Sequence, residues 1–107
     1  MIYYKITVPD RNDAVMRVNL DGNFYNLRTT WNEFAGFWML SVYDASMNLL
    51  IGMERLSPGA VWNFFYSGVV GPPGLLGVVT ESDTVGRSDF VTGKAALVYV
   101  PAAEMGV

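Results

Sequence analysis

The stretch LRTTWNEFAGFWMLSVYD, residues Leu27 to Asp44, decides the fold class. Two runs of aromatic, aliphatic and β-branched residues each carry a tryptophan, and the turn-rich break Asn32 to Gly36 separates them. Runs of this composition are typical of strands, and short links are common only between antiparallel neighbours. The stretch therefore predicts a β-hairpin with strands at Phe24 to Trp31 and Phe37 to Tyr43.

A second turn signal, Asp21-Gly22, lies just upstream. Both central positions of a type I′ turn need positive φ, which Asp-Gly accommodates. The pair predicts that Val15 to Leu20 runs antiparallel to Phe24 to Trp31, with Gly22 in a left-handed conformation. Apolar and polar residues alternate along Val15 to Leu20, and Met16 is interpreted as the residue out of phase.

Other turn-forming residues divide the rest of the chain into further predicted strands. Ser57 is a candidate N-cap and Pro58 a candidate first helical residue, which favours a short helix over Val61 to Tyr66, with a strand as the alternative. Polar turn formers fill Glu81 to Asp89. Further strands are predicted at Ile2 to Val8, Leu49 to Met53 with a possible bulge at Gly52, Leu75 to Thr80, and Ala95 to Val100.

Many short strands separated by turns predict an all-β fold. We expect a small antiparallel β-sandwich or a partly closed β-barrel with one short helical segment. At 107 residues the chain is expected to be a single β domain, 1–107. Its end, residues 102–107, is expected to be a flexible tail or to dock on a partner.

Charged residues are scarce. They make up 16% of the chain while hydrophobic residues make up 51%, and average globular chains carry about 25% charged residues. Surplus apolar surface favours contact with other proteins, although a compact, sparsely charged monomer is the alternative. In Phe37 to Tyr43 both alternating sets are largely apolar, so we expect this strand to be covered on both faces. Its own core would cover one face, and a partner subunit or the segment Val61 to Tyr66 would cover the other.

The residue types argue against an enzyme. The chain has no histidine and no cysteine, which removes nucleophilic triads and structural zinc sites, and no cofactor is expected. Glu81, Asp83 and Asp89 lack the spacing of a calcium loop and are interpreted as a solvated turn. The basic residues are scattered singly, which argues against direct nucleic acid binding. No apolar run reaches the length of a membrane helix, so no membrane anchor is expected.

Two groups of residues are candidates for contacts. The irregular segment around Gly71 to Gly74 is no phosphate loop, because its two prolines lack amide donors. We expect it to reach neighbouring proteins, through Val70, Gly71, Pro72, Pro73, Gly74 and Leu75. The aromatic residues, among them Trp31, Trp38 and Trp62, are typical of a core or interface, with a sugar-binding platform as the alternative. Burial of the tryptophans would decide between these interpretations.

The ordered motifs resemble those of the small plug proteins of contractile phage tail baseplates, known from cyanophage-type myophages. The motifs are Asp21-Gly22, LRTTW at 27–31, WMLSVYD at 38–44, LSPG at 56–59 and LVYVP at 97–101. The segment Gly68 to Gly86 follows no recognisable family pattern. Six residues in or beside these motifs are expected to be structural, and we call them the frame residues: Gly22, Trp31, Trp38, Tyr43, Pro58 and Tyr99.

The resemblance implies a non-enzymatic virion component, made in the host cytoplasm and placed where the tail tube meets the baseplate hub. Its partners would be tail tube and hub proteins, and its copies would form a ring in the particle. The competing hypothesis is a stand-alone β-sandwich binding module, for example for carbohydrate, that uses exposed aromatic residues.

Overall fold

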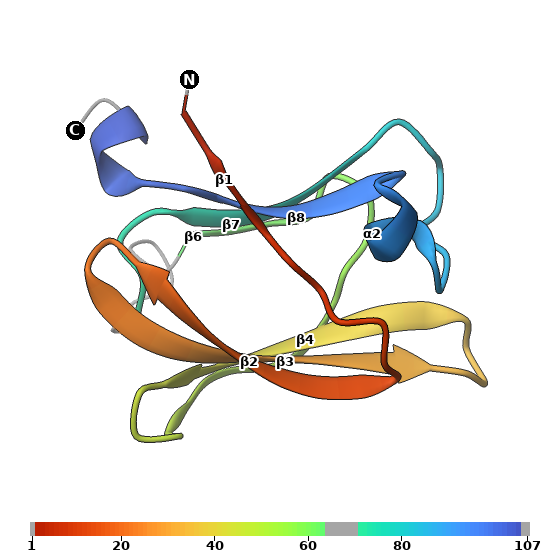
Figure 1. Ribbon diagram of the computed structural model, residues 1–107, viewed down its shortest axis with the longest axis horizontal. Helices are drawn as coiled ribbons and strands as arrows, with labels where there is room; N and C mark the ends of the chain where they lie inside the picture. Colours follow the sequence, from red (N-terminus) through yellow and green to blue (C-terminus); the bar gives the residue numbers. More distant parts are fainter. Residues whose placement is uncertain (1, 64–70, 106–107) are drawn as a thin grey trace.

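Two four-stranded antiparallel sheets form the two layers of a sandwich (Figure 1). The computed structural model describes residues 2–63 and 71–105. The sheets are not closed into a barrel, so the predicted sandwich is confirmed and the barrel alternative is wrong. One sheet has the order β1-β8-β7-β6 and the other the order β2-β3-β4-β5. The strands are β1 (Tyr4–Ile6), β2 (Asp13–Leu20), β3 (Asn23–Asn32), β4 (Phe37–Asp44), β5 (Leu49–Arg55), β6 (Val61–Asn63), β7 (Leu75–Thr80) and β8 (Ala95–Val100).

The hairpin predicted from Leu27 to Asp44 is confirmed as β3 and β4. Trp31 pairs with Trp38 next to the turn. Within the turn, the Gly36 N–H donates to the Asn32 carbonyl at 2.7 Å, and the Ala35 N–H donates to Asn32 Oδ1 at 2.9 Å. These bonds hold the turn in one conformation.

The Asp21-Gly22 turn is also confirmed. Asp21 has a φ of 56° and Gly22 a φ of 87°, both in the left-handed region that a type I′ turn requires. The Gly22 N–H donates to Asn19 Oδ1 at 2.9 Å. Pairing of Leu20 with Asn23 then sets the register of β2 on β3.

The phase predicted for β2 is wrong at one residue. Met16 packs against the core together with Val18, on the face that carries the buried Leu20. Val15 is the residue out of phase, 54% exposed on the outer face. Side chains alternate strictly along a strand, so Leu20 in the core places every second residue before it on the same face.

Strand β4 is covered unequally on its two faces. Trp38, Leu40 and Val42 face the core, and each is 1% exposed. Phe37, Met39 and Tyr43 on the opposite face are partly buried. The Arg55 guanidinium of β5 lies 4.5 Å from the centre of the Phe37 ring and covers part of this face. Cover by a partner subunit stays a prediction.

The bulge expected at Gly52 is confirmed, with a different residue in the strained position. Two residues, Gly52 and Met53, lie opposite Ser41, where the β4–β5 register shifts. Met53 has the positive φ, 29°, and its N–H donates to Ser41 Oγ at 3.1 Å. This bond replaces a ladder hydrogen bond that the bulge removes.

The short helix predicted after Ser57-Pro58 is wrong in the described residues. Gly59 has a φ of 75°, and the Ala60 N–H donates to the Ser57 carbonyl, which closes a turn instead of starting a helix. Strand β6 follows, with Trp62 paired to Leu76 of β7, so the alternative strand is confirmed there. Residues 64–66 lie outside the described residues.

The helix occurs later in the chain. It is α2 (Asp89–Thr92), and it begins at the end of the predicted polar loop. Asp89 Oδ2 accepts the Gly86 N–H at 2.7 Å, and Gly93 ends the helix with a φ of 85°. After β8, a 3₁₀ turn spans Ala102–Met105. The flexibility of the tail stays a prediction.

A buried threonine hydroxyl lies in the apolar core. Thr29 of β3 is fully buried between Ala14 and Leu40 of the flanking strands. Its Oγ1 has no hydrogen-bond partner within residues 2–63 and 71–105. Burying a hydroxyl without a partner costs free energy, because its hydrogen bonds to water are lost and not replaced.

Replacing Thr29 with valine is expected to raise the free energy of unfolding by about 1 kcal/mol, since valine keeps the shape and removes the unpaired hydroxyl. Urea denaturation of the two proteins measures the difference. A loss of stability in Thr29→Val would show that the hydroxyl has a favourable interaction in the folded protein.

Replacing Gly22 with valine forces a β-branched residue into positive φ. We expect a loss of roughly 1 kcal/mol or more in unfolding free energy. Gly52→Val is the matched control, because Gly52 does not have positive φ and an added Cβ meets only ordinary contacts. Thermal melts that are the same for wild type and Gly22→Val would contradict the type I′ turn.

Candidate functional site

The outer face of the β1-β8-β7-β6 sheet is apolar. Val61, Gly77 and Val98 form one row across it, and Val79 pairs with Ala96 in the next. Val61 is 59% and Val79 is 56% exposed, Leu75, Ala96 and Val100 are partly buried, and Gly77 and Val98 are buried. Polar side chains lie at the rim, Lys5 on β1 and Asn63 on β6. We call this surface the apolar face; its residues are Val61, Leu75, Gly77, Val79, Ala96, Val98 and Val100.

The candidate contact segment borders the apolar face. Pro73 is exposed, whereas Pro72 and Gly74 are buried. Leu75 begins β7 and pairs with Val100 within the apolar face. Val70 lies outside the described residues. The segment therefore leaves Pro73 exposed and Leu75 partly exposed, while Pro72 and Gly74 are packed against the rest of the protein.

The anchor is a hydrogen-bond cluster around the buried Tyr99. The Gly74 N–H donates to the Tyr99 hydroxyl at 2.8 Å, and that hydroxyl donates to Asp21 Oδ2 at 2.5 Å. The same carboxylate oxygen accepts the Ala102 N–H at 3.1 Å. A Cβ at Gly74 would lie 2.7 Å from the Tyr99 oxygen, so only glycine fits there. The cluster joins the β2–β3 turn, the loop before β7 and the chain after β8.

The surroundings of Tyr99 also raise its pKa well above the usual value. Burial disfavours the charged phenolate, and the hydrogen bond to the Asp21 carboxylate favours the protonated form. The Gly74 N–H acts in the opposite direction, with a smaller effect than either. The hydroxyl therefore remains a hydrogen-bond donor to Asp21 at neutral pH.

Trp38 organises the opposite end of the sandwich. Its indole packs edge-on against Trp31, with ring centres 5.5 Å apart, and against Phe90 of α2, at 6.1 Å. Trp38 Nε1 donates to the Gly86 carbonyl at 3.2 Å. The Arg87 guanidinium lies 5.1 Å from the indole centre, and it also pairs with Asp10 at 2.9 Å. These contacts attach α2 to β4 and to the chain before β2.

The alternative ligand sites find no support in the described structure. Trp38 is buried, and Trp31 and Trp62 are partly buried against the core, so they form no exposed sugar platform. Glu81 and Asp83 are exposed and Asp89 caps a turn. Residues 2–63 and 71–105 contain no cluster of three potential metal-ligating side chains. Over the same residues no helix has the length and apolarity needed to cross a membrane.

A comparison with protein families decides the assignment. A family model described as cyanophage baseplate Pam3 plug gp18 matches residues 1–102. The chain belongs to this baseplate plug family. No curated protein matches the chain. Membership in the baseplate plug family indicates a structural role in the baseplate and a location in the tail baseplate of the virion.

In this plug protein the six expected frame residues occupy different environments. Trp38 and Tyr99 are buried. Trp31 packs partly buried beside Trp38, and Tyr43 lies partly buried on the outer face of β4. Gly22 and Pro58 lie in turns. The structure brings Trp31 and Trp38 together at one end and places Gly22 next to the carboxylate that binds Tyr99 at the other.

Sequence reasoning misses three residues that the fold makes important. The sequence marks Asp21 only as a turn residue, although its carboxylate binds Tyr99 and the Ala102 N–H. It shows Arg87 as one of the scattered charges, although Arg87 joins Asp10 to Trp38. Phe34 belongs to a predicted turn and proves to be fully exposed. The sequence does give one signal for Phe34, because a phenylalanine is unusual within a polar turn.

Removing the Tyr99 hydroxyl tests the cluster. Tyr99→Phe leaves the buried Gly74 N–H without an acceptor, and we expect a loss of about 1–3 kcal/mol in unfolding free energy. Tyr4→Phe is the control, because Tyr4 is 60% exposed. A loss in Tyr99→Phe no larger than in Tyr4→Phe would contradict a stabilising role for the hydroxyl.

The raised pKa of Tyr99 also predicts a pH dependence. In the unfolded chain the phenol ionises near pH 10, whereas in the folded protein it keeps its proton to higher pH. Its contribution to stability is complete below pH 10 and is lost as pH rises further. Denaturant titrations at pH 8 to 11 should show a steeper loss for wild type than for Tyr99→Phe. Parallel losses would contradict this.

Proposed function

We propose that this plug-family protein works where the tail tube meets the baseplate hub, as a non-catalytic component that binds tube and hub proteins. We further propose that its copies form a ring in the particle. The observation that carries the proposal is the apolar face, whose exposed members Val61 and Val79 flank the buried Gly77 and Val98 on one sheet. Exposed aliphatic side chains that gather on one face of a protein typically mark a contact site.

The contact segment extends the same surface. Leu75 belongs to the apolar face, and exposed Pro73 lies two residues before it. The Gly74–Tyr99 hydrogen bond and the buried Pro72 already hold the segment in place. Little conformational entropy is therefore lost when Pro73 and Leu75 meet a partner, which favours binding. We propose that residues 71–75 contact a neighbouring baseplate protein.

The absence of catalysis in the proposal rests on composition. Without histidine and cysteine, the chain lacks the commonest general base and the strongest side-chain nucleophile. The scattered basic residues support protein partners over nucleic acid. Binding by shape and apolar contact is the role that the remaining side chains can perform.

A charge placed on the apolar face tests the proposal. Val79→Glu is expected to fold with nearly unchanged stability, because Val79 is 56% exposed, and to reduce incorporation into particles at least tenfold. A contact residue would have to bury the new carboxylate without a partner charge. The measurement is the amount of plug protein per purified particle, with thermal melts to check folding.

Val15→Glu is the matched control. Val15 is 54% exposed on a strand of the other sheet, so the substitution is the same, the exposure is similar, and the main difference is the face. We expect Val15→Glu to enter particles at the wild-type level. Equal incorporation of both variants would remove the apolar face from the list of contacts.

A further inference from the structure

The fold gathers three of the seven basic residues of the chain on one sheet face. Arg17 of β2, Arg28 of β3 and Arg55 of β5 are exposed on the outer side of the β2-β3-β4-β5 sheet, opposite the core. Asp13 on the same side contributes one negative charge. The surface is therefore positive, although the chain as a whole has a formal net charge of −3. We call it the arginine face; its residues are Asp13, Val15, Arg17, Phe24, Arg28, Phe37, Met39, Tyr43 and Arg55.

Only part of this positive charge is neutralised within the protein. Arg28 Nε donates to Asp13 Oδ1 at 2.8 Å, and its Nη2 donates to Asp13 Oδ2 at 2.6 Å, so these two residues form a bidentate ion pair. Arg17 and Arg55 have no carboxylate partner within residues 2–63 and 71–105. The arginine face therefore holds two guanidinium groups that are free to bind an anion.

An aromatic ring positions each of these two guanidinium groups. The Arg17 guanidinium lies 4.2 Å from the centre of the Phe24 ring, and the Arg55 guanidinium lies 4.5 Å from the centre of the Phe37 ring. A guanidinium stacked on a ring keeps its N–H groups at the edge available to a carboxylate, which it can bind through two parallel hydrogen bonds. Because stacking already restricts the side chain, less entropy is lost when it binds.

The spacing of the two free arginines indicates the kind of partner. Arg17 and Arg55 lie on the two edge strands, and two intervening strands and four residues of register place their backbones roughly 20 Å apart. No single small anion reaches both. Two free cations would also neutralise too few phosphates to hold a nucleic acid. Val15, Met39 and Tyr43 add exposed or partly exposed apolar surface between them, and arginine beside aromatic and apolar residues is typical of protein interfaces.

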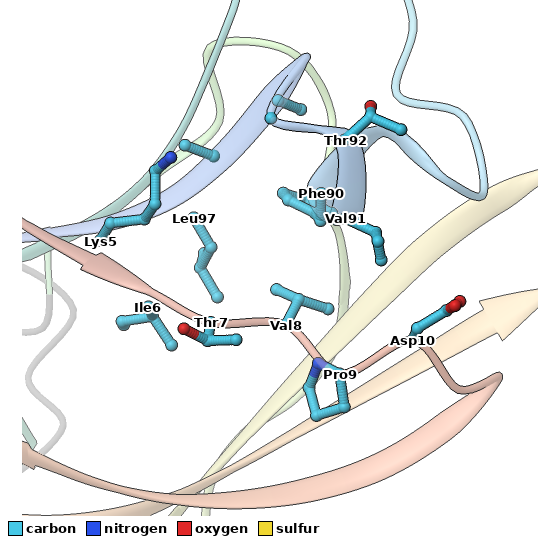
Figure 2. A pocket seen from close by; sticks show the side chains of 13 residues that line it. Lys5, Ile6, Thr7, Val8, Pro9, Asp10, Phe90, Val91, Thr92 and Leu97 are labelled. Atoms are coloured by element: carbon cyan, nitrogen blue, oxygen red, sulfur yellow. The ribbon is translucent and has the colours of Figure 1, made fainter.

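The apolar groove next to α2 differs from the arginine face (Figure 2). It lies between α2 and the chain from β1 to Asp10, has a volume of about 450 Å³, and is lined by apolar residues such as Ile6 and Phe90. Asp10 is paired with Arg87, and Lys5 points to the outer side of β1. With its charged residues paired or turned away, the groove selects no partner by charge, whereas the arginine face does.

We propose that the arginine face binds an acidic surface on a further protein of the particle, with Arg17 and Arg55 each pairing with a carboxylate. Two copies of this chain meeting face to face would oppose arginine with arginine, so a different protein is favoured. The inference goes beyond the proposed function, because the arginine face and the apolar face belong to opposite sheets. A plug protein held through the apolar face can bind the acidic partner at the same time.

Site-specific photo-cross-linking in assembled particles tests the contact. The chain has no native cysteine, so Val15→Cys provides a single attachment point for a photoreactive maleimide. Val15 is 54% exposed and pairs with Arg28 in the register of β2 and β3. Particles that contain the labelled protein are irradiated, and the cross-linked peptides are identified by mass spectrometry. We expect adducts with a different protein, at a peptide that carries several Asp or Glu residues.

Charge reversal then tests the chemistry of the contact. The double substitution Arg17→Glu/Arg55→Glu should lower the adduct yield at least tenfold and leave the amount of plug protein per particle unchanged. Lys94→Glu is the matched control, because Lys94 is exposed next to β8 of the other sheet and the change in charge per residue is the same; it should leave the yield unchanged. Lysine substitutions of the cross-linked carboxylates on the partner should restore the adduct of the double variant. Thermal melts check that each variant folds.

Every other outcome overturns the inference. Adducts with a second copy of this chain, with DNA or with a peptide that lacks acidic residues would each assign the face to a different partner. An acidic adduct that survives the double charge reversal would show that the arginines do not hold it. Exclusion of the folded double variant from particles would contradict a contact that is separate from incorporation. The proposed function is tested independently, because it depends on Val79→Glu and the opposite sheet.

Discussion

The hydrogen bond from Tyr99 to Asp21 joins the two sheets at one end of the sandwich, and much of the molecule depends on it. Asp21 belongs to the turn of the β2–β3 hairpin, whereas Tyr99 lies on β8 of the other sheet. The same hydroxyl accepts the Gly74 N–H, which fixes the loop before β7. Because Tyr99 is buried, losing the bond would leave its hydroxyl proton without an acceptor.

The opposite end is held by aromatic packing and by the Arg87–Asp10 ion pair. Trp38 of β4 contacts Phe90 of α2, and Arg87 bridges from the indole to Asp10. These contacts hold a helix of only four residues, too short to be stable alone. With both ends joined, the sandwich is a rigid frame, and its loops and turns can present Pro73 and Phe34 in defined positions.

A rigid sandwich with exposed apolar residues on one sheet suits a structural protein of a baseplate. The apolar face lies on the β1-β8-β7-β6 sheet, while the β3–β4 turn lies at the α2 end of the sandwich (Figure 1). The proposed contacts with tube and hub proteins would therefore involve one of the two sheets.

The sequence by itself determined the hairpins, because Asp21-Gly22 and the Asn32 to Gly36 turn act through local backbone preferences. It also indicated the plug family, through the order of its motifs. Only the tertiary structure decided that Ser57-Pro58 precedes a strand, since pairing of Trp62 with Leu76 is a long-range contact that outweighs a weak local signal. The apolar face and the Tyr99 cluster likewise bring together residues far apart in the chain. No local pattern encodes which distant side chains will meet, so these surfaces became visible only after folding.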